Sequence, residues 1–178
     1  MAIFSFGDFH EDLGYKVVDE RVMRGSAGIM LFLGAIALVN GFVLNKFGVI
    51  PYITGFLAIN FAIGIFINPK FAPSYFIAEW MVEKQSPIYI GAIQKRFAWS
   101  LGFTLTAITF ILSLYLLNDI SYFIRVCQLC IICNFLLYLE TAFGICVGCK
   151  LYHGAIKYKL LKEPEIKPNC MGDSCDID

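Results

Sequence analysis

Two cysteines, Cys146 and Cys149, form a Cys-x-x-Cys motif at the end of the last apolar run of this 178-residue chain. Side chains three residues apart on a helix can approach one another, so this pair can act as a dithiol. The adjacent Lys150 favours a thiolate at Cys149. We therefore expect Cys149 to be the more acidic thiol and Cys146 its resolving partner, which predicts thiol redox or sulfane-sulfur chemistry.

Glu140 lies six residues before Cys146, deep inside the same apolar run. A carboxylate in hydrocarbon is costly unless it is paired or protonated, so Glu140 is a candidate proton or polar site. The alternative is a structural, protonated acid that is hydrogen-bonded to Asn60 or a threonine. A packing role is also open for the cysteine motif, because Gly144 and Gly148 form a G-x-x-x-G pattern.

Five further cysteines are possible thiolate ligands of a soft metal ion: Cys127, Cys130, Cys133, Cys170 and Cys175. Cys127 and Cys149 are separated by twenty-two residues, roughly 33 Å along a helix, so no single metal site includes both ends. His10 and His153 are too far apart in the chain to form a paired histidine motif. The sequence therefore defines no metal, and it contains no motif for an organic cofactor.

The composition is that of a membrane protein, with 58% hydrophobic and only 16% charged residues. The mean hydropathy is +0.70. The formal net charge is zero, so no overall basic field attracts nucleic acid. The partner that the composition implies is the lipid bilayer.

The hydrophobic pattern predicts an all-α membrane protein with four transmembrane helices, because each apolar run matches a hydrocarbon core of about 30 Å. The expected spans are 25–44, 47–67, 97–117 and 120–145. A short interfacial amphipathic helix is expected between spans two and three, with Trp80 at headgroup depth. Three regions follow: a cytoplasmic segment 1–24 that ends in a short helix, a membrane domain 25–149, and a tail 150–178 that is first basic and then flexible and cysteine-containing.

Orientation follows from the distribution of lysine and arginine. The N-terminal segment holds three, the central loop four and the tail five, whereas the other side holds only Lys46 and Arg125. The positive-inside rule therefore predicts that both termini are cytoplasmic. Cys146 and Cys149 are then expected at the cytoplasmic end of the fourth helix.

Four stretches support a resemblance: VVDERVMRG at 17–25, Asn68-Pro69, KRFAWSLG at 95–102 and LETAFGICVGCKLY at 139–152. They resemble the bacterial membrane family called domain of unknown function 4395. The resemblance implies a four-helix protein of the bacterial cytoplasmic (inner) membrane without an assigned activity. The triad Cys127, Cys130 and Cys133 and the tail pair Cys170 and Cys175 lie outside the resembling pattern.

Three functions remain open from the sequence alone. The sequence does not decide whether the protein is an enzyme. The first is a thiol redox or sulfane-sulfur protein that works with a soluble thioredoxin-like or rhodanese-like partner. The second is a soft-metal or small-solute carrier with Glu140 in its path, and the third is a structural membrane assembly subunit.

Overall fold

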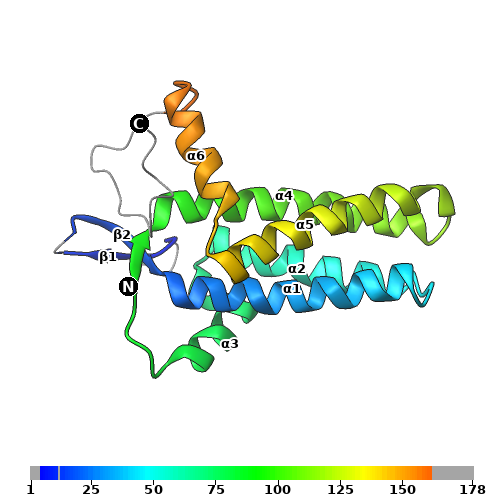
Figure 1. Ribbon diagram of the computed structural model, residues 1–178, viewed down its shortest axis with the longest axis horizontal. Coiled ribbons are helices and arrows are strands. Elements are labelled where there is room, and N and C mark those ends of the chain that lie inside the picture. The colour runs from blue at the N-terminus through cyan, green and yellow to red at the C-terminus, as the bar shows by residue number, and fades with distance from the viewer. Residues whose placement is uncertain (1–4, 12, 162–178) are drawn as a thin grey trace.

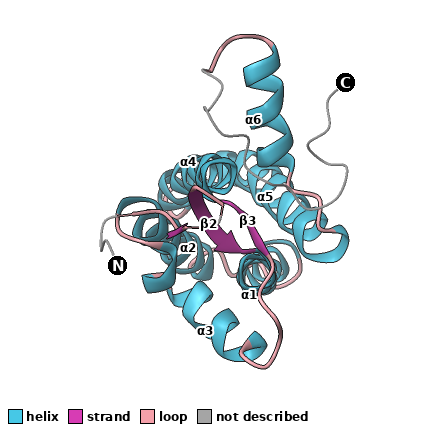
Figure 2. Ribbon diagram, turned by 90° about the vertical axis from the view of Figure 1, so that its left-hand side faces the viewer, coloured by secondary structure: helices cyan, strands magenta, loops and turns pink. Residues whose placement is uncertain are grey.

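The computed structural model describes residues 5–11 and 13–161, and its body is an antiparallel four-helix bundle (Figure 1). The bundle helices are α1 (Glu20–Phe42), α2 (Val49–Phe66), α4 (Ala92–Leu116) and α5 (Phe123–Phe143). α1 packs against α2 and α5, and α4 packs against the same two helices. Figure 2 shows this closed arrangement from the end at which the strands lie.

Four helices are long and apolar enough to cross a membrane, at Glu20–Phe42, Val49–Phe66, Ala92–Leu116 and Ile120–Phe143. Their outward faces are apolar as well, which is typical of contact with lipid because a soluble monomer rarely exposes so large an apolar surface. The exposed side chains include Phe32, Val39, Ile59, Phe66, Ile111, Leu114, Ile124, Ile131 and Phe135. A long apolar helix is therefore present at each of the four expected spans, and the fold is mostly helical.

The prediction of an all-α protein missed a small antiparallel sheet at one end of the bundle. The strands are β1 (Asp8–His10), β2 (Tyr15–Asp19) and β3 (Tyr89–Gly91), in the order β1-β2-β3. Segment 1–24 was expected to contain only a short helix, but β-branched Val17 and Val18 are buried in β2. β2 pairs with β3, with Asp19 opposite Tyr89.

This sheet fixes where two bundle helices begin. Asp19 caps α1 by accepting a hydrogen bond from the Arg21 amide at 2.9 Å, and the Glu20 amide donates to the carbonyl of Ile88 at 2.8 Å. β3 runs directly into α4 at Ala92. Both helices consequently start five residues before the expected spans 25–44 and 97–117, and their charged first turns are helical.

Helix α3 (Pro73–Val82) follows a short 3₁₀ turn, η1 (Pro69–Phe71), and lies beside α1. The Oδ1 of Asn60 accepts from the Ser74 amide at 2.9 Å, and the hydroxyls of Ser74 and Ser26 are 2.7 Å apart. The large apolar side chains of α3 point away from the bundle, since Phe76 and Trp80 are exposed. A helix is therefore present between the second and third long helices, with polar contacts to the bundle and exposed apolar side chains, and its interfacial position stays a prediction.

The expected fourth span ends earlier than predicted. After the 3₁₀ turn η2 (Ile120–Tyr122), α5 stops at Phe143, and Gly144 adopts a left-handed conformation with φ of 69°. Glycine is favoured there because it has no Cβ to clash. A separate helix, α6 (Val147–Lys157), then leaves the bundle at an angle (Figure 1). Gly144 and Gly148 thus do not form a helical G-x-x-x-G motif.

Candidate functional site

Cys146 and Cys149 are joined by a disulfide at the first turn of α6. Cys146 is the N-cap residue of this helix, and its Sγ accepts a hydrogen bond from the Cys149 amide at 3.2 Å. A helix N-terminus stabilises a thiolate because its free amides and the helix dipole both favour negative charge. The geometry therefore favours Cys146 as the better-stabilised thiolate. The sequence pattern predicted Cys149 instead, because Cys149 is next to Lys150. The side chain of Lys150 is exposed.

α6 holds the pair against α4. A Cβ on Gly148 would lie 2.6 Å from the Cα of Ala98, so the two backbones approach as closely as glycine allows. Tyr152 is buried beside the ring of Phe97, with ring centroids 5.6 Å apart. Burial raises the pKa of Tyr152 and lowers the pKa of His153, so the inner side of α6 favours neutral side chains.

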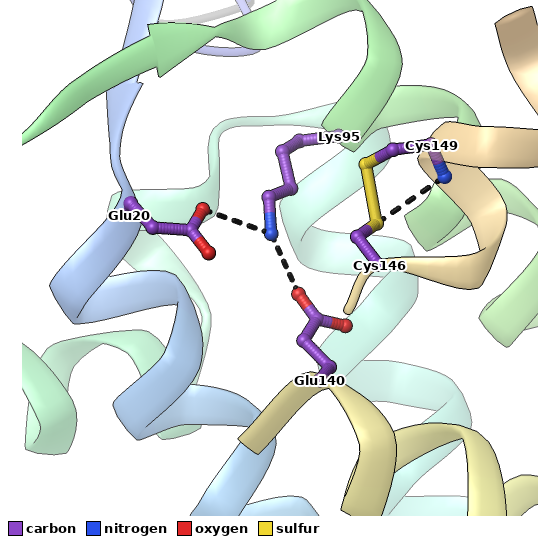
Figure 3. The surroundings of a disulfide bond; sticks show 5 residues. All are labelled: Glu20, Lys95, Glu140, Cys146 and Cys149. Atoms are coloured by element: carbon purple, nitrogen blue, oxygen red, sulfur yellow. Dashed lines mark hydrogen bonds and ion pairs between the residues drawn. A yellow bond between two sulfur atoms is a disulfide. The ribbon is translucent and has the colours of Figure 1, made fainter. Parts of the chain in front are cut away.

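Next to the disulfide, Lys95 lies between two carboxylates (Figure 3). Its Nζ is 2.7 Å from Oε1 of Glu140 and 3.0 Å from Oε2 of Glu20. The side chains of Lys95 and Glu20 are almost fully buried, and that of Glu140 is 17% exposed. This ionic triad links α4, α5 and α1. The partner of Glu140 is Lys95, whereas the structural alternative in the sequence interpretation named Asn60 or a threonine.

The triad alone would carry one excess negative charge. Arg24, one turn along α1 from Glu20, interacts electrostatically with that carboxylate, which makes the group of four formally neutral. Arg24 also donates to the carbonyl of Thr141 at 3.0 Å, near the end of α5. The C-terminal end of α5, before the helix break at Gly144, is therefore tied to α1 and α4 by charged groups.

Sequence reasoning missed Lys95 and Glu20 as site residues. Both were counted as surface charges of polar segments, because each lies at the edge of an apolar run. The one signal that required a partner was the depth of Glu140 in its helix. The partner could not be chosen among fourteen lysines and arginines without the β2–β3 pairing that aligns α1 and α4.

A cavity of about 330 Å³ extends into the bundle from this site. Glu140 and Cys146 line it, and Cys149 does not. Most of the remaining wall is apolar, and it is formed by all four bundle helices and α6: Met23, Ala27, Met30, Leu57, Phe61, Trp99, Leu101, Leu105, Leu137 and Leu151. The volume is within the range of small-molecule sites.

The other candidate cysteines are separate from the disulfide. Cys127 and Cys130 are buried and reduced, and Cys130 packs in an apolar cluster with Ile50 and Val126. Cys133 is half-buried and lines the cavity, on the same face of α5 as Glu140. Within residues 5–11 and 13–161, no three histidine, cysteine or acidic side chains are grouped closely enough to hold a metal ion. Cys170 and Cys175 lie outside the described residues.

Comparison with known protein families identifies the family of the chain that contains this site. The family described as Domain of unknown function (DUF4395) matches residues 18–157. The protein belongs to the DUF4395 family. The DUF4395 segment runs from the end of β2 to the last residue of α6 and contains the disulfide and the ionic triad, whereas Cys170 and Cys175 fall beyond it. No curated protein and no solved structure matches the chain.

Proposed function

We propose that this DUF4395 protein is a thiol–disulfide exchange protein of the bacterial inner membrane, in which Cys146 and Cys149 alternate between disulfide and dithiol. The observation that carries the proposal is the disulfide at the N-terminus of α6, with the Cys149 amide donating to the Cys146 sulfur at 3.2 Å. This contact favours Cys146 as the leaving thiolate when the bond is opened.

The electron donor is a soluble thioredoxin-like dithiol on the cytoplasmic side. Its first thiolate attacks Sγ of Cys149, the Cys146–Cys149 bond breaks, and the bonding electron pair leaves on Cys146 as a thiolate. The second donor thiolate attacks the donor's own sulfur in the mixed disulfide and releases Cys149 as a thiolate. Two electrons pass to the pair, the donor becomes a disulfide, and the donor's two protons pass to the released thiolates or to solvent.

The cytoplasmic orientation is part of the proposal. The sheet, α3 and α6 lie at one end of the bundle, and the two turns at 43–48 and 117–122 lie at the other (Figure 1). The lysine- and arginine-rich segments belong to the first end, which supports a cytoplasmic position for both termini. In this position the exposed face of α3, with Phe76 and Trp80, contacts the membrane interface.

A rhodanese-like donor that transfers sulfane sulfur to one of the cysteines is the alternative partner. The two cysteines are joined to each other, and this favours two-electron thiol–disulfide exchange. The carrier function is less well supported. A thiolate carrier needs ligands grouped along α5, and the described residues hold no such group.

Trapping of a mixed disulfide tests the proposal. The purified protein in lipid is mixed with reduced thioredoxin, and free thiols are counted. We expect the wild type to gain two thiols and Cys133→Ser to behave as the wild type. Cys146→Ser pre-activated at Cys149 should form a stable mixed disulfide with a thioredoxin whose second cysteine is replaced by serine, because neither partner then has a thiol that can resolve it. A wild-type pair that stays oxidised in excess donor, with no mixed disulfide in the variant, would refute the exchange function.

A further inference from the structure

The cavity beside the disulfide is lined by Cys146, the cysteine that the soluble donor does not attack. Cys146 lines the cavity and Cys149 does not, so the two thiols of the pair face different surroundings. A pair that receives two electrons through Cys149 must pass them on before it can react again. The position of Cys146 makes the cavity the place where the second reactant binds.

The surroundings of the cavity restrict what can enter it. Thr104 and Leu151 are exposed side chains that line the cavity, so its mouth opens at the outer surface of α4 and α6. Thr104 lies inside a span that is apolar enough for hydrocarbon. A molecule that enters by this route is dissolved in lipid, and it meets a mainly apolar wall with the aromatic rings of Phe61 and Trp99.

Four polar side chains other than cysteine interrupt this wall: Thr104, Thr106, Asn134 and Glu140. Glu140 is held by Lys95, and Asn134 donates through Nδ2 to the carbonyl of Cys130 at 2.8 Å. The Oδ1 of Asn134 is buried and accepts no hydrogen bond from the described part of the chain. The amide of Asn134 and the carboxylate of Glu140 on the cavity wall favour a ligand that carries hydroxyl groups in at least one of its states.

We infer that the cavity binds a lipid-soluble quinone, which reoxidises the dithiol; this inference rests on the exchange function proposed above. A quinone is flat and apolar, accepts two electrons and two protons, and becomes a hydroquinone with two hydroxyl donors. Asn134 and Glu140 are the amide and the carboxylate on the cavity wall to which these hydroxyls can bond, and the Glu140 carboxylate is the proton-handling group at the Cys146 end.

The step is balanced in atoms and electrons. The Cys146 thiolate adds to the quinone ring, and a C–S bond forms while the ring accepts the electron pair and a proton. The Cys149 thiolate then attacks Sγ of Cys146, the S–S bond forms, and the C–S bond breaks with its electron pair left on the ring. A second proton completes the hydroquinone. The net change is dithiol plus quinone to disulfide plus hydroquinone.

Binding is tested with a decyl-tailed benzoquinone and the fluorescence of Trp99. The chain has two tryptophans, and only Trp99 lines the cavity, so Trp80→Phe leaves one reporter. We expect saturable quenching that a decyl alcohol does not relieve at the same concentration. Quenching that the alcohol relieves equally well would identify a site for lipid chains and overturn the inference, as would the absence of saturation.

Turnover is tested by the rate at which the quinone oxidises the reduced protein. Leu137→Trp places a larger ring in the cavity and should lower this rate at limiting quinone about tenfold. The matched control is Ile132→Trp on the same helix, where the side chain is exposed and lies outside the cavity, and it should keep the wild-type rate. Thiol counts after chemical reduction show whether each variant retains its cysteines in folded form.

The two proposals fail in different ways. If the pair exchanges with thioredoxin, but quinone oxidises both tryptophan variants at equal rates or oxidises neither, only the quinone inference is refuted. If the pair reacts with neither thioredoxin nor quinone, both the exchange function and the quinone inference are refuted.

Discussion

Lys95 and Glu140 form an ion pair between α4 and α5, with Nζ and Oε1 2.7 Å apart, at the end of the cavity that Cys146 closes. Since Lys95 also binds Glu20 of α1, one ammonium group holds three of the four bundle helices beside the disulfide. The position of the disulfide therefore depends on a buried charge as well as on packing.

Replacing Lys95 with Met should lower the free energy of unfolding by about 3–5 kcal/mol, because two carboxylates lose their shared cation. Glu140→Gln should be milder, since Lys95 keeps Glu20 as a partner. Denaturant titration in detergent micelles measures both. The control is Lys150→Met at an exposed position, where a change within about 0.5 kcal/mol is expected. Equal stability of all three variants would show that the triad does not stabilise the fold.

The two thiols should differ in their reaction with an alkylating reagent. In Cys149→Ser, the backbone amide at 149 still donates to Cys146, so Cys146 should form its thiolate and react at a lower pH than Cys149 does in Cys146→Ser. Mass spectrometry after timed alkylation over a pH series gives the two profiles. A lower reaction pH for Cys149 would instead support the influence of Lys150.

Gly148→Ala should detach α6 from α4. The added Cβ would lie 2.6 Å from a backbone atom of Ala98, so the helix must shift, at an expected loss of about 1–3 kcal/mol. Faster reduction of the disulfide by a small soluble reductant measures the exposure that follows. Gly154→Ala is the matched control in the same helix, because no atom lies within 4 Å of its new Cβ. It should gain about 0.5–1 kcal/mol from helix propensity.

His153 should make the docking of α6 sensitive to pH. Burial lowers its pKa from the usual 6.5, so the folded protein favours the neutral ring. The stabilisation is present above the unfolded pKa and is lost as the pH falls through the folded one. We expect reduction of the disulfide by a water-soluble phosphine, which needs no thiolate, to accelerate as the pH falls below about 6.5, and His153→Gln to flatten this profile. An unchanged profile in the variant would assign the effect to another group.

Reporter fusions test the orientation. A fusion after Asp178 and one before the N-terminal strands should both report the cytoplasm, because most lysines and arginines lie at that end. An insertion in the 43–48 turn, next to Lys46, should report the opposite side. A C-terminal reporter outside the cytoplasm would contradict the four-span arrangement.

The apolar runs were sufficient to predict the four bundle helices, because burial in hydrocarbon dictates both their length and their composition. The Cys-x-x-Cys pair was also readable from the sequence. Its neighbours were not, since Glu20, Lys95 and Glu140 meet only through pairing between β2 and β3, which are about seventy residues apart. The break at Gly144 was missed because the apolar run continues through it, although a glycine there is a common helix end.

The three charges of the triad are synthesised far apart in time, in the order Glu20, Lys95, Glu140. α1 and α2 are complete before the ribosome reaches Lys95, so Glu20 has no ammonium partner from α4 while the first hairpin inserts. Once β3 and the first turn of α4 are synthesised, Lys95 can form a neutral ion pair with Glu20. Glu140 on α5 is synthesised after that pair can form, and Cys146 and Cys149 follow it. The disulfide site is therefore assembled last, beside helices whose first ion pair can already be in place.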